Sequence, residues 1–279
     1  MLIQVVSDLH LEFAPLTLFN HRNADVLILS GDIKSAKMDA TDFFDHVSKE
    51  YPKVFYVAGN HEFYGGDFAT EIERIRDFCS RYSNVTFLDD EHVVHNGVLF
   101  IGSTLWTSMK HTPDFEHSFF QQAMNDYRAI SNGHGQKLAP ADTILAHHTS
   151  MAYIEKTIHD FEFSDPDMPI VVMTHHMPSY LSVHPKYRGS SLNECFYSEL
   201  GDFIADKKNL TLWTCGHTHD PHKYRIGNTV ILANPRGYVF SRRNEAENPN
   251  WNPDYGLIDI SVPVEELVPD ENVVQWLLE

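Results

Sequence analysis

Cysteine is scarce in this sequence, and long apolar runs are missing. Cys79, Cys195 and Cys215 are the three cysteines of 279 residues. Their odd number and wide spacing exclude a disulfide framework and suit a reducing compartment. No apolar run approaches the length that spans a bilayer, and no charged segment with a longer apolar core precedes the first strand-like run. We therefore expect a cytoplasmic protein with no membrane partner.

Positive charge is also scarce. Lys and Arg number 21 against 39 Asp and Glu, which gives a net charge of -18 with histidine neutral. Such a balance argues against binding duplex nucleic acid, which needs a basic face. It does not exclude a phosphate-bearing substrate, because bound divalent metals reverse the sign of the charge locally.

The pattern of apolar residues predicts an α/β fold. Strand-like runs at 2–7, 25–30 and 53–58 alternate with helical spacing at 38–50 and 67–82, as in a sheet covered by helices. Further runs at 85–88, 92–94 and 98–101, the last two joined by Asn96-Gly97, predict an antiparallel meander. The later expected elements are strands at 170–173, 210–213, 229–232 and 256–261 and a helix at 193–207.

Residues 105–166 read as a helical insertion or cap within a single domain, 1–279, since no hinge rich in Pro, Gly or Ser flanks them. Helices are expected at 114–130 and 140–160. The aromatic residues here either roof a site and stack a base or pack as core, which their helical spacing favours; they are Trp106, Phe115, Phe119, Phe120 and Tyr127. We expect His147 and His148 on the solvated face of a helix.

Five short polar clusters each follow an apolar run. They are Asp8-Leu9-His10, Gly31-Asp32, Gly59-Asn60-His61-Glu62, Thr174-His175-His176 and Gly216-His217-Thr218-His219. Each cluster alone has an ordinary explanation, such as a turn, a helix cap at Asp32 or a satisfied histidine pair. Taken together, the strand ends supply seven oxygen and nitrogen ligands and no thiolate, namely Asp8, His10, Asp32, Asn60, His175, His217 and His219. Seven ligands exceed one tetrahedral site and suit two metals that share a carboxylate.

This ordered set of motifs, spanning residues 8 to 219, resembles the calcineurin-like metallophosphoesterase superfamily. The resemblance implies two mixed β-sheets sandwiched between helices, in four layers. It implies that one metal takes Asp8, His10 and His219, and the other takes Asn60, His175 and His217. Asp32 then bridges the two metals. The residues leave the metals open among manganese, iron and zinc.

The resemblance also implies a mechanism. A metal-bridging hydroxide is the family's usual nucleophile, and His61 matches the histidine that contacts the phosphate and protonates the leaving oxygen. Relatives with Thr-His-Gly keep only the first histidine, so His175 is assigned as the ligand and His176 lines the substrate site or packs. The run after Gly31-Asp32 lacks the further acidic or asparagine residue that the family often has there.

Substrate contacts are expected from Asn60, His61, His176, Asn193 and Arg236. An arginine can clamp a phosphate with two hydrogen bonds, although a structural role is the favoured alternative for Arg236. The segment Asn125-Asp126-Tyr127-Arg128 is a further candidate. Gly59 is expected to allow a tight turn, and Glu62 either orients His61 or caps the next segment.

The leading hypothesis is a dinuclear-metal-dependent phosphohydrolase acting on a small phosphomonoester or phosphodiester, including nucleotide-type substrates. A nuclease and a phosphoprotein phosphatase are alternatives within the same chemistry. An interaction scaffold is an alternative of another class, since some members of the superfamily have lost their ligands. The presence of every ligand together with His61 favours the enzyme. The substrate, the metal and the oligomeric state stay open at this stage.

Overall fold

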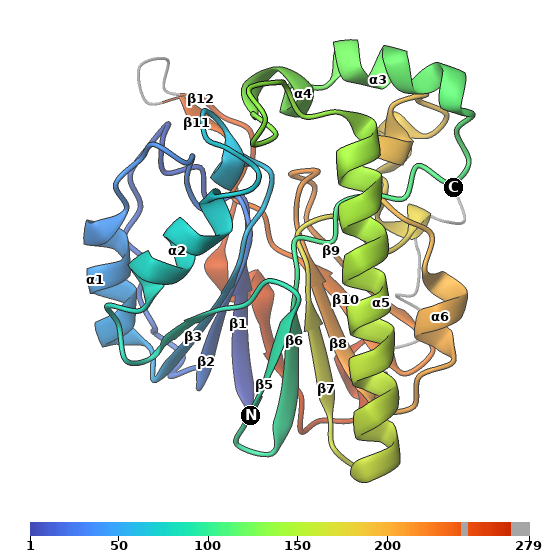
Figure 1. The fold of residues 1–279 in the computed structure, drawn as a ribbon. Helices are drawn as coiled ribbons and strands as arrows, with labels where there is room; N and C mark the ends of the chain where they lie inside the picture. Colours follow the sequence, from blue (N-terminus) through green and yellow to red (C-terminus); the bar gives the residue numbers. More distant parts are fainter. Residues whose placement is uncertain (241–244, 269–279) are drawn as a thin grey trace.

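Two β-sheets form the centre of the molecule (Figure 1). A computed structural model describes residues 1–240 and 245–268. The first sheet has the strand order β13-β1-β2-β3-β4, and the second has the order β5-β6-β7-β8-β10-β9. Both sheets mix parallel and antiparallel pairs. The predicted class, two mixed sheets between helices, is confirmed.

The first sheet comes mainly from the N-terminal third of the chain. Its strands are β1 (Leu2–Val6), β2 (Val26–Ser30), β3 (Lys53–Val57), β4 (Val85–Phe87) and β13 (Leu257–Asp259). Strand side chains alternate between faces, so Leu27 and Leu29 point outward while Val26 and Ile28 point toward the second sheet. The helices α1 (Thr41–Glu50) and α2 (Glu71–Cys79) cover the outer face through residues such as Phe44.

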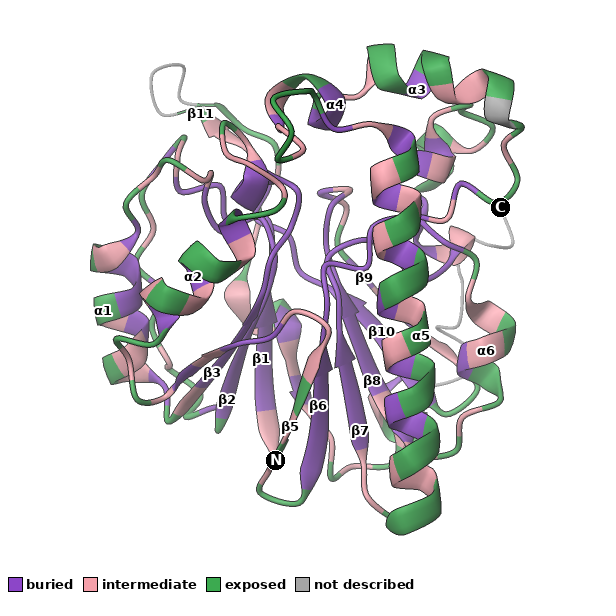
Figure 2. Cartoon of the chain, viewed as in Figure 1, coloured by how far each residue is buried: buried purple, intermediate pink, exposed green. Residues whose placement is uncertain are grey.

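The second sheet is built from later segments. Its strands are β5 (Glu91–His95), β6 (Val98–Gly102), β7 (Ile170–Met173), β8 (Leu210–Cys215), β9 (His222–Ile226) and β10 (Thr229–Ala233). The long helix α5 (Pro140–Ser164) covers the outer face with Ile154 and Ile158, and α6 (Gly201–Ala205) adds Ile204. The inner faces of the two sheets meet in a third apolar cluster, and Figure 2 shows these strands as almost wholly buried.

The remaining elements lie around this frame. They are the helices α3 (His117–Ala123), α4 (Asp126–Ala129) and α7 (Val264–Leu267), the small ribbon of β11 (Val239–Phe240) with β12 (Glu245–Ala246), and the 3-10 turns at His61–Phe63, Asp114–Glu116, Tyr180–Ser182, Pro185–Tyr187, Asn193–Cys195 and Pro253–Gly256. In Figure 1, α3 and α4 lie over the upper ends of the strands. The part of the chain with coordinates has no helix both long and apolar enough to cross a membrane.

Several predicted elements were wrong in detail. The meander is a single hairpin, β5 with β6, because β4 pairs in parallel with β3 in the other sheet. The helix predicted at 193–207 is reduced to a 3-10 turn at Asn193–Cys195 and the five-residue α6. The helix predicted at 114–130 breaks at Met124 and Asn125, between α3 and α4. Local periodicity does not reveal which sheet a strand joins or where a loop interrupts a helix.

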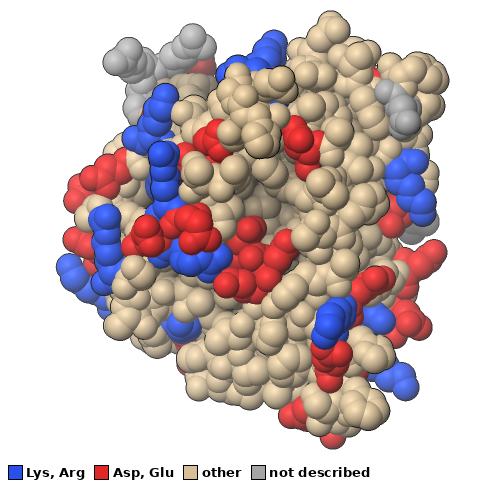
Figure 3. All heavy atoms as spheres, viewed as in Figure 1, with Lys and Arg blue, Asp and Glu red and all other residues tan. Residues whose placement is uncertain are grey.

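The segment 105–166 plays two structural parts. Its α3 and α4 lie over the strand ends, whereas α5 is one of the layers that cover the second sheet. Of its aromatic residues, Trp106, Phe120 and Tyr127 are buried as expected for core, but Phe115 and Phe119 are exposed. On the face drawn in Figure 3, basic and acidic side chains are intermixed, and acidic ones border a central hollow.

Candidate metal centre

The seven predicted ligands converge at one end of the sheets. Asp8 and His10 follow β1, Asp32 follows β2, and Asn60 follows β3. From the second sheet, His175 follows β7, and His217 and His219 follow β8. Parallel strands deliver the residues at their carboxyl ends to the same edge of a sheet, and here the two edges face each other. The seven side chains are all buried.

These side chains form two groups that share Asp32. Ligand atoms of Asp8, His10, Asp32 and His219 lie within 4.8 Å of one another, as do those of Asp32, His175 and His217. Asp32 Oδ2 faces His10 Nε2 at 3.7 Å, and Asp32 Oδ1 faces His175 Nε2 at 3.5 Å. Asn60 completes the second group, because its Oδ1 is 3.0 Å from both His175 Nε2 and His217 Nδ1.

Hydrogen bonds on the outer side of the imidazoles orient three of them. His10 Nδ1 lies 3.2 Å from Glu12, His175 Nδ1 lies 3.0 Å from the Ser30 carbonyl, and His219 Nδ1 contacts Glu247. When a ring donates its Nδ1 proton to an oxygen, its Nε2 lone pair is left for a metal. The Nε2 atoms of His10 and His219 are only 2.9 Å apart, so two such lone pairs would repel unless a cation lay against them.

The centre fits a divalent cation by a further criterion. Asp8 Oδ2 is a buried carboxylate oxygen without a hydrogen-bond partner among the described residues. A buried charged oxygen left in this way is costly, and a cation removes the cost. Carboxylate, amide and imidazole donors without thiolate are typical of manganese, iron and zinc sites. The cluster can therefore hold divalent metal.

Strained backbone positions the ligands. Five of the seven, Asp8, His10, Asp32, His217 and His219, have positive φ angles between 45° and 75°. A non-glycine residue in this region costs on the order of 1–3 kcal/mol and persists only where its surroundings enforce it. Backbone strain concentrated on the ligands indicates that the loops are shaped for the site.

Two glycines let the loops approach closely. A Cβ on Gly31 would lie 2.4 Å from the His175 ring, and one on Gly59 would lie 2.3 Å from Asp32 Oδ1. Gly59 does not have a positive φ, whereas Gly31 does, at 81°. Glycine is therefore required at position 59 by close packing against Asp32, and the expected explanation, a tight turn, is wrong.

Glu62 joins the loops after β2 and β3. Its buried carboxylate accepts hydrogen bonds from the backbone N–H of Gly59, Asp32, Ile33 and Lys34 and from the Tyr56 hydroxyl, at 2.7–3.2 Å. This role differs from both that were expected, because Glu62 neither contacts the His61 ring nor caps a helix. The carboxylate of Glu62 accepts hydrogen bonds from the backbone N–H groups of the turn that carries Asp32 and so holds that turn in place.

His61 lies beside the two groups of ligands. Its backbone N–H donates to Asp32 Oδ1 at 2.8 Å, its Nδ1 is 2.9 Å from Glu12, and its Nε2 is 3.2 Å from the Tyr238 hydroxyl. Burial by itself lowers the pKa of His61, but the Asp32 charge and the Glu12 hydrogen bond outweigh burial and raise the pKa to about 9. The ring is thus held as a proton carrier at neutral pH.

Two carboxylates of the site, Glu12 and Glu247, were missed in the sequence, and Asp126 was named there only within the candidate segment Asn125-Asp126-Tyr127-Arg128. Glu12 bridges His10 and His61, Glu247 contacts His219, and Asp126 accepts from Asn60 Nδ2 at 2.8 Å. Asp126 thereby turns the Asn60 oxygen toward the ligands. Glu12 had a signal, because alternate residues of Asp8-x-His10-x-Glu12 continue one pattern, whereas Glu247, just after β12, had none.

Of the five residues expected to contact substrate, three line the cavity, one packs beside the ligands and Arg236 supports a loop. Asn60, His61 and Asn193 line a cavity beside the ligands. His176 does not line it and instead packs between Trp106 and His217, where burial and the neighbouring His175 lower its pKa to about 3. Packing was one of its two expected roles.

Two predictions need correction, namely the substrate contact of Arg236 and the solvated position of His147. Arg236 is buried, and its guanidinium donates to the carbonyls of Leu9, Ala14 and Pro15, so it supports the loop after β1 and does not reach the cavity. His147 is buried and contacts the Leu105 carbonyl, whereas His148 is exposed as expected. Because Arg236 and His147 bind backbone carbonyls of other segments, their burial depends on long-range packing.

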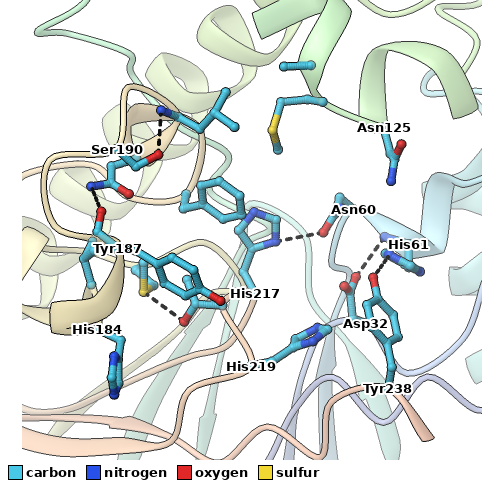
Figure 4. A pocket seen from close by; sticks show the side chains of 18 of the residues that line it. Asp32, Asn60, His61, Asn125, His184, Tyr187, Ser190, His217, His219 and Tyr238 are labelled. Carbon is cyan, nitrogen blue, oxygen red and sulfur yellow. Dashed lines mark hydrogen bonds between the residues drawn. The ribbon is translucent and has the colours of Figure 1, made fainter. Parts of the chain in front are cut away.

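The cavity has a volume of about 450 Å³. One wall is formed by Asp32, Asn60, His61, His217, His219 and Tyr238, and we call it the metal wall. A second wall, which we call the far wall, comes from residues 123–125 and from the segment 177–196, and Figure 4 shows its Asn125 on the same side as Asn60 and His61. Figure 4 shows His184, Tyr187 and Ser190 of the far wall across the cavity from Asp32, His61 and Tyr238. The volume is in the range of small-ligand sites.

Comparisons with known proteins identify the family and the fold of the chain. Residues 1–221 match the model of the calcineurin-like phosphoesterase family. Uncharacterized protein L509 of Acanthamoeba polyphaga mimivirus is 29% identical over 294 residues, which cover 93% of this chain and 96% of that protein. The crystal structure of phosphopantetheinyl hydrolase (PptH) from Mycobacterium tuberculosis superposes with a TM-score of 0.68 at 16% identity, over 89% of this chain and 93% of that one. The chain belongs to the calcineurin-like phosphoesterase family and is a hydrolase of phosphoester bonds.

Proposed function

We propose that this phosphoesterase uses two divalent metals and hydrolyses a small phosphoester. The observation that carries the proposal is the place of Asp32, whose two oxygens face one group of ligands each. Asp8, His10 and His219 would hold one metal, and Asn60, His175 and His217 would hold the other. When bound, such metals lower the pKa of water and neutralise phosphate oxygens.

The residues of the chain then have defined tasks. Glu12 accepts the Nδ1 proton of His61, which keeps the ring oriented with Nε2 toward the cavity and the Tyr238 hydroxyl. A ring with a raised pKa carries a second proton on Nε2 at neutral pH, and this proton can pass to the leaving oxygen. Before substrate binds, the hydroxyl of Tyr238 occupies the position beside His61 Nε2 that the leaving oxygen would take.

We propose a cytoplasmic protein whose metals are manganese, iron or zinc and whose substrate is a small phosphomonoester or phosphodiester. The intermixed charges in Figure 3 and the net charge of -18 support a small substrate over duplex nucleic acid. The fold likeness to a protein named phosphopantetheinyl hydrolase makes phosphopantetheine compounds a reasonable addition to a substrate panel.

A panel screen tests the proposal. Metal-depleted protein would be reloaded with manganese, iron or zinc and offered nucleotides, cyclic nucleotides, sugar phosphates, phosphopantetheine and chromogenic mono- and diesters. We expect metal-dependent turnover of at least one small ester, with two metals per chain by elemental analysis. Absence of turnover with every metal would contradict the enzyme and favour the interaction scaffold, while cleavage of oligonucleotides alone would favour a nuclease.

A further inference from the structure

The far wall of the cavity is largely apolar. Its apolar side chains are those of Met124, Met177, Val183, Leu192 and Phe196. They come from two separate segments, the junction between α3 and α4 and the loops between β7 and α6. Phe196 also packs against the ring of His217, with centroids 4.9 Å apart, so the apolar surface continues directly to the ligands.

Among the described residues, the far wall contributes no Lys, Arg, Asp or Glu to the cavity lining, and its one imidazole, His184, accepts a hydrogen bond at Nδ1 from the Lys186 backbone N–H at 3.2 Å. Tyr187, Ser190 and Asn193 lie among the apolar residues, and Asn193 Nδ2 is bonded to the Tyr187 carbonyl at 2.9 Å. Hydroxyl and amide groups of this kind pair with neutral donors and acceptors on a ligand. They offer no counter-charge to an anion.

Charged lining residues are confined to the other side. Within residues 1–240 and 245–268, the carboxylates that line the cavity are Asp32 and Glu247, and no Lys or Arg does so. Two cations outside the lining are held by other groups: Arg128 donates to Asn125 Oδ1 and the Ala123 carbonyl behind the far wall, and Lys186 donates to Asp220. An anionic group against the far wall would therefore be desolvated without a Lys or Arg of the lining to pair with it.

We infer that the substrate has one phosphoryl group, which meets the metal wall, and an uncharged, partly apolar organic arm, which lies against the far wall. This inference rests on the proposed function and names its substrate class. It separates esters with an extended neutral arm from bisphosphates and from very short esters. The reacting bond remains the phosphoester at the metal wall.

A matched series of esters tests the inference. Ethyl phosphate, hexyl phosphate and hexane-1,6-diyl bisphosphate all have primary alkyl leaving alcohols, and each would also be made as its 4-nitrophenyl diester. In the ester class that turns over, we expect kcat/KM to be about 10²-fold higher for hexyl than for ethyl, because four more methylenes are buried. We expect it to fall about tenfold or more when the arm ends in a second phosphate.

Variants of the far wall complete the test. Met124→Lys should narrow the preference for hexyl over bisphosphate about tenfold by supplying a counter-charge, and Leu192→Lys is a second variant if the first lowers the melting temperature. Phe163→Lys, at an exposed position on α5, adds the same charge outside the cavity and should leave the preference unchanged.

The outcomes keep the two proposals apart. Turnover with equal kcat/KM across the series, or a preference for the bisphosphate in the unaltered protein, would overturn the neutral arm and leave the phosphohydrolase intact. Absence of turnover for every ester, including the chromogenic diesters with each metal, would instead contradict the proposed function.

Discussion

The metal wall and the far wall line one cavity but are built differently. The metal wall comes from the ends of β2, β3 and β8 together with Tyr238, and its ligand side chains are buried and held by hydrogen bonds. The far wall comes from short helices and loops, and several of its residues, such as Tyr187 with 48% exposure, remain open to solvent. The rigid strand ends therefore position the groups that carry out the reaction, while the less constrained segments determine which substrate fits beside those groups.

The largest expected effect is loss of the shared carboxylate. Asp32→Asn keeps the shape of the side chain but removes the charge that faces both groups of ligands, so we expect metal content to fall and kcat/KM to drop by about 10³-fold or more for all esters. Elemental analysis and kinetics would measure this. Full occupancy by two metals in the variant would contradict the bridging role of Asp32 and the assignment of metal binding to the metal wall.

Substitution of His61 tests proton donation at the metal wall separately from metal binding. His61→Ala should retain metal and lower kcat by about 10²–10⁴-fold for esters with poor leaving groups, because the proton donor is lost. Glu12→Gln should give a smaller loss, since the ring is only less well oriented. An unchanged kcat for an alkyl ester in the His61 variant would remove the residue from the mechanism.

Glu62 tests whether the metal wall is held by its own hydrogen bonds. Glu62→Gln cannot accept from all five donors, so we expect the free energy of unfolding to fall by about 2–4 kcal/mol. Chemical denaturation of the metal-free protein would measure the loss. Glu155→Gln, at an exposed position on α5, is the matched control, and equal stability of both variants would argue against the anchoring role.

The smallest effect concerns a carboxylate outside both walls. Burial and the neighbouring Asp90 raise the pKa of Asp89 to about 7. The folded state then binds more protons than the unfolded state between pH 4 and 7, so stability falls as pH rises through this range. Asp89→Asn should therefore raise the melting temperature by about 2–4 °C at pH 8 but not at pH 4. A gain that is the same at both pH values would show that charge burial is not its cause.

The sequence alone was sufficient to group the seven ligand residues. Each ligand follows an apolar run, and a run of four to six residues with a glycine or polar turn indicates a buried strand and its end. Strand ends of an α/β sheet converge, so Asp8, Asp32 and His217 could be grouped without coordinates. The alternation of strands and helices likewise predicted a sheet covered by helices, and the family resemblance implied the second sheet.

Only the tertiary structure decided the far wall and the supports of the site. Asp126 reaches Asn60 from the start of the short helix α4, and Glu247 reaches His219 from just after β12. Arg236 hydrogen-bonds to backbone carbonyls more than 200 positions away in the chain. Met124 and Leu192 become neighbours of the site because a helix breaks and a loop folds back. Periodicity reports local backbone and burial, whereas these contacts depend on how distant segments pack.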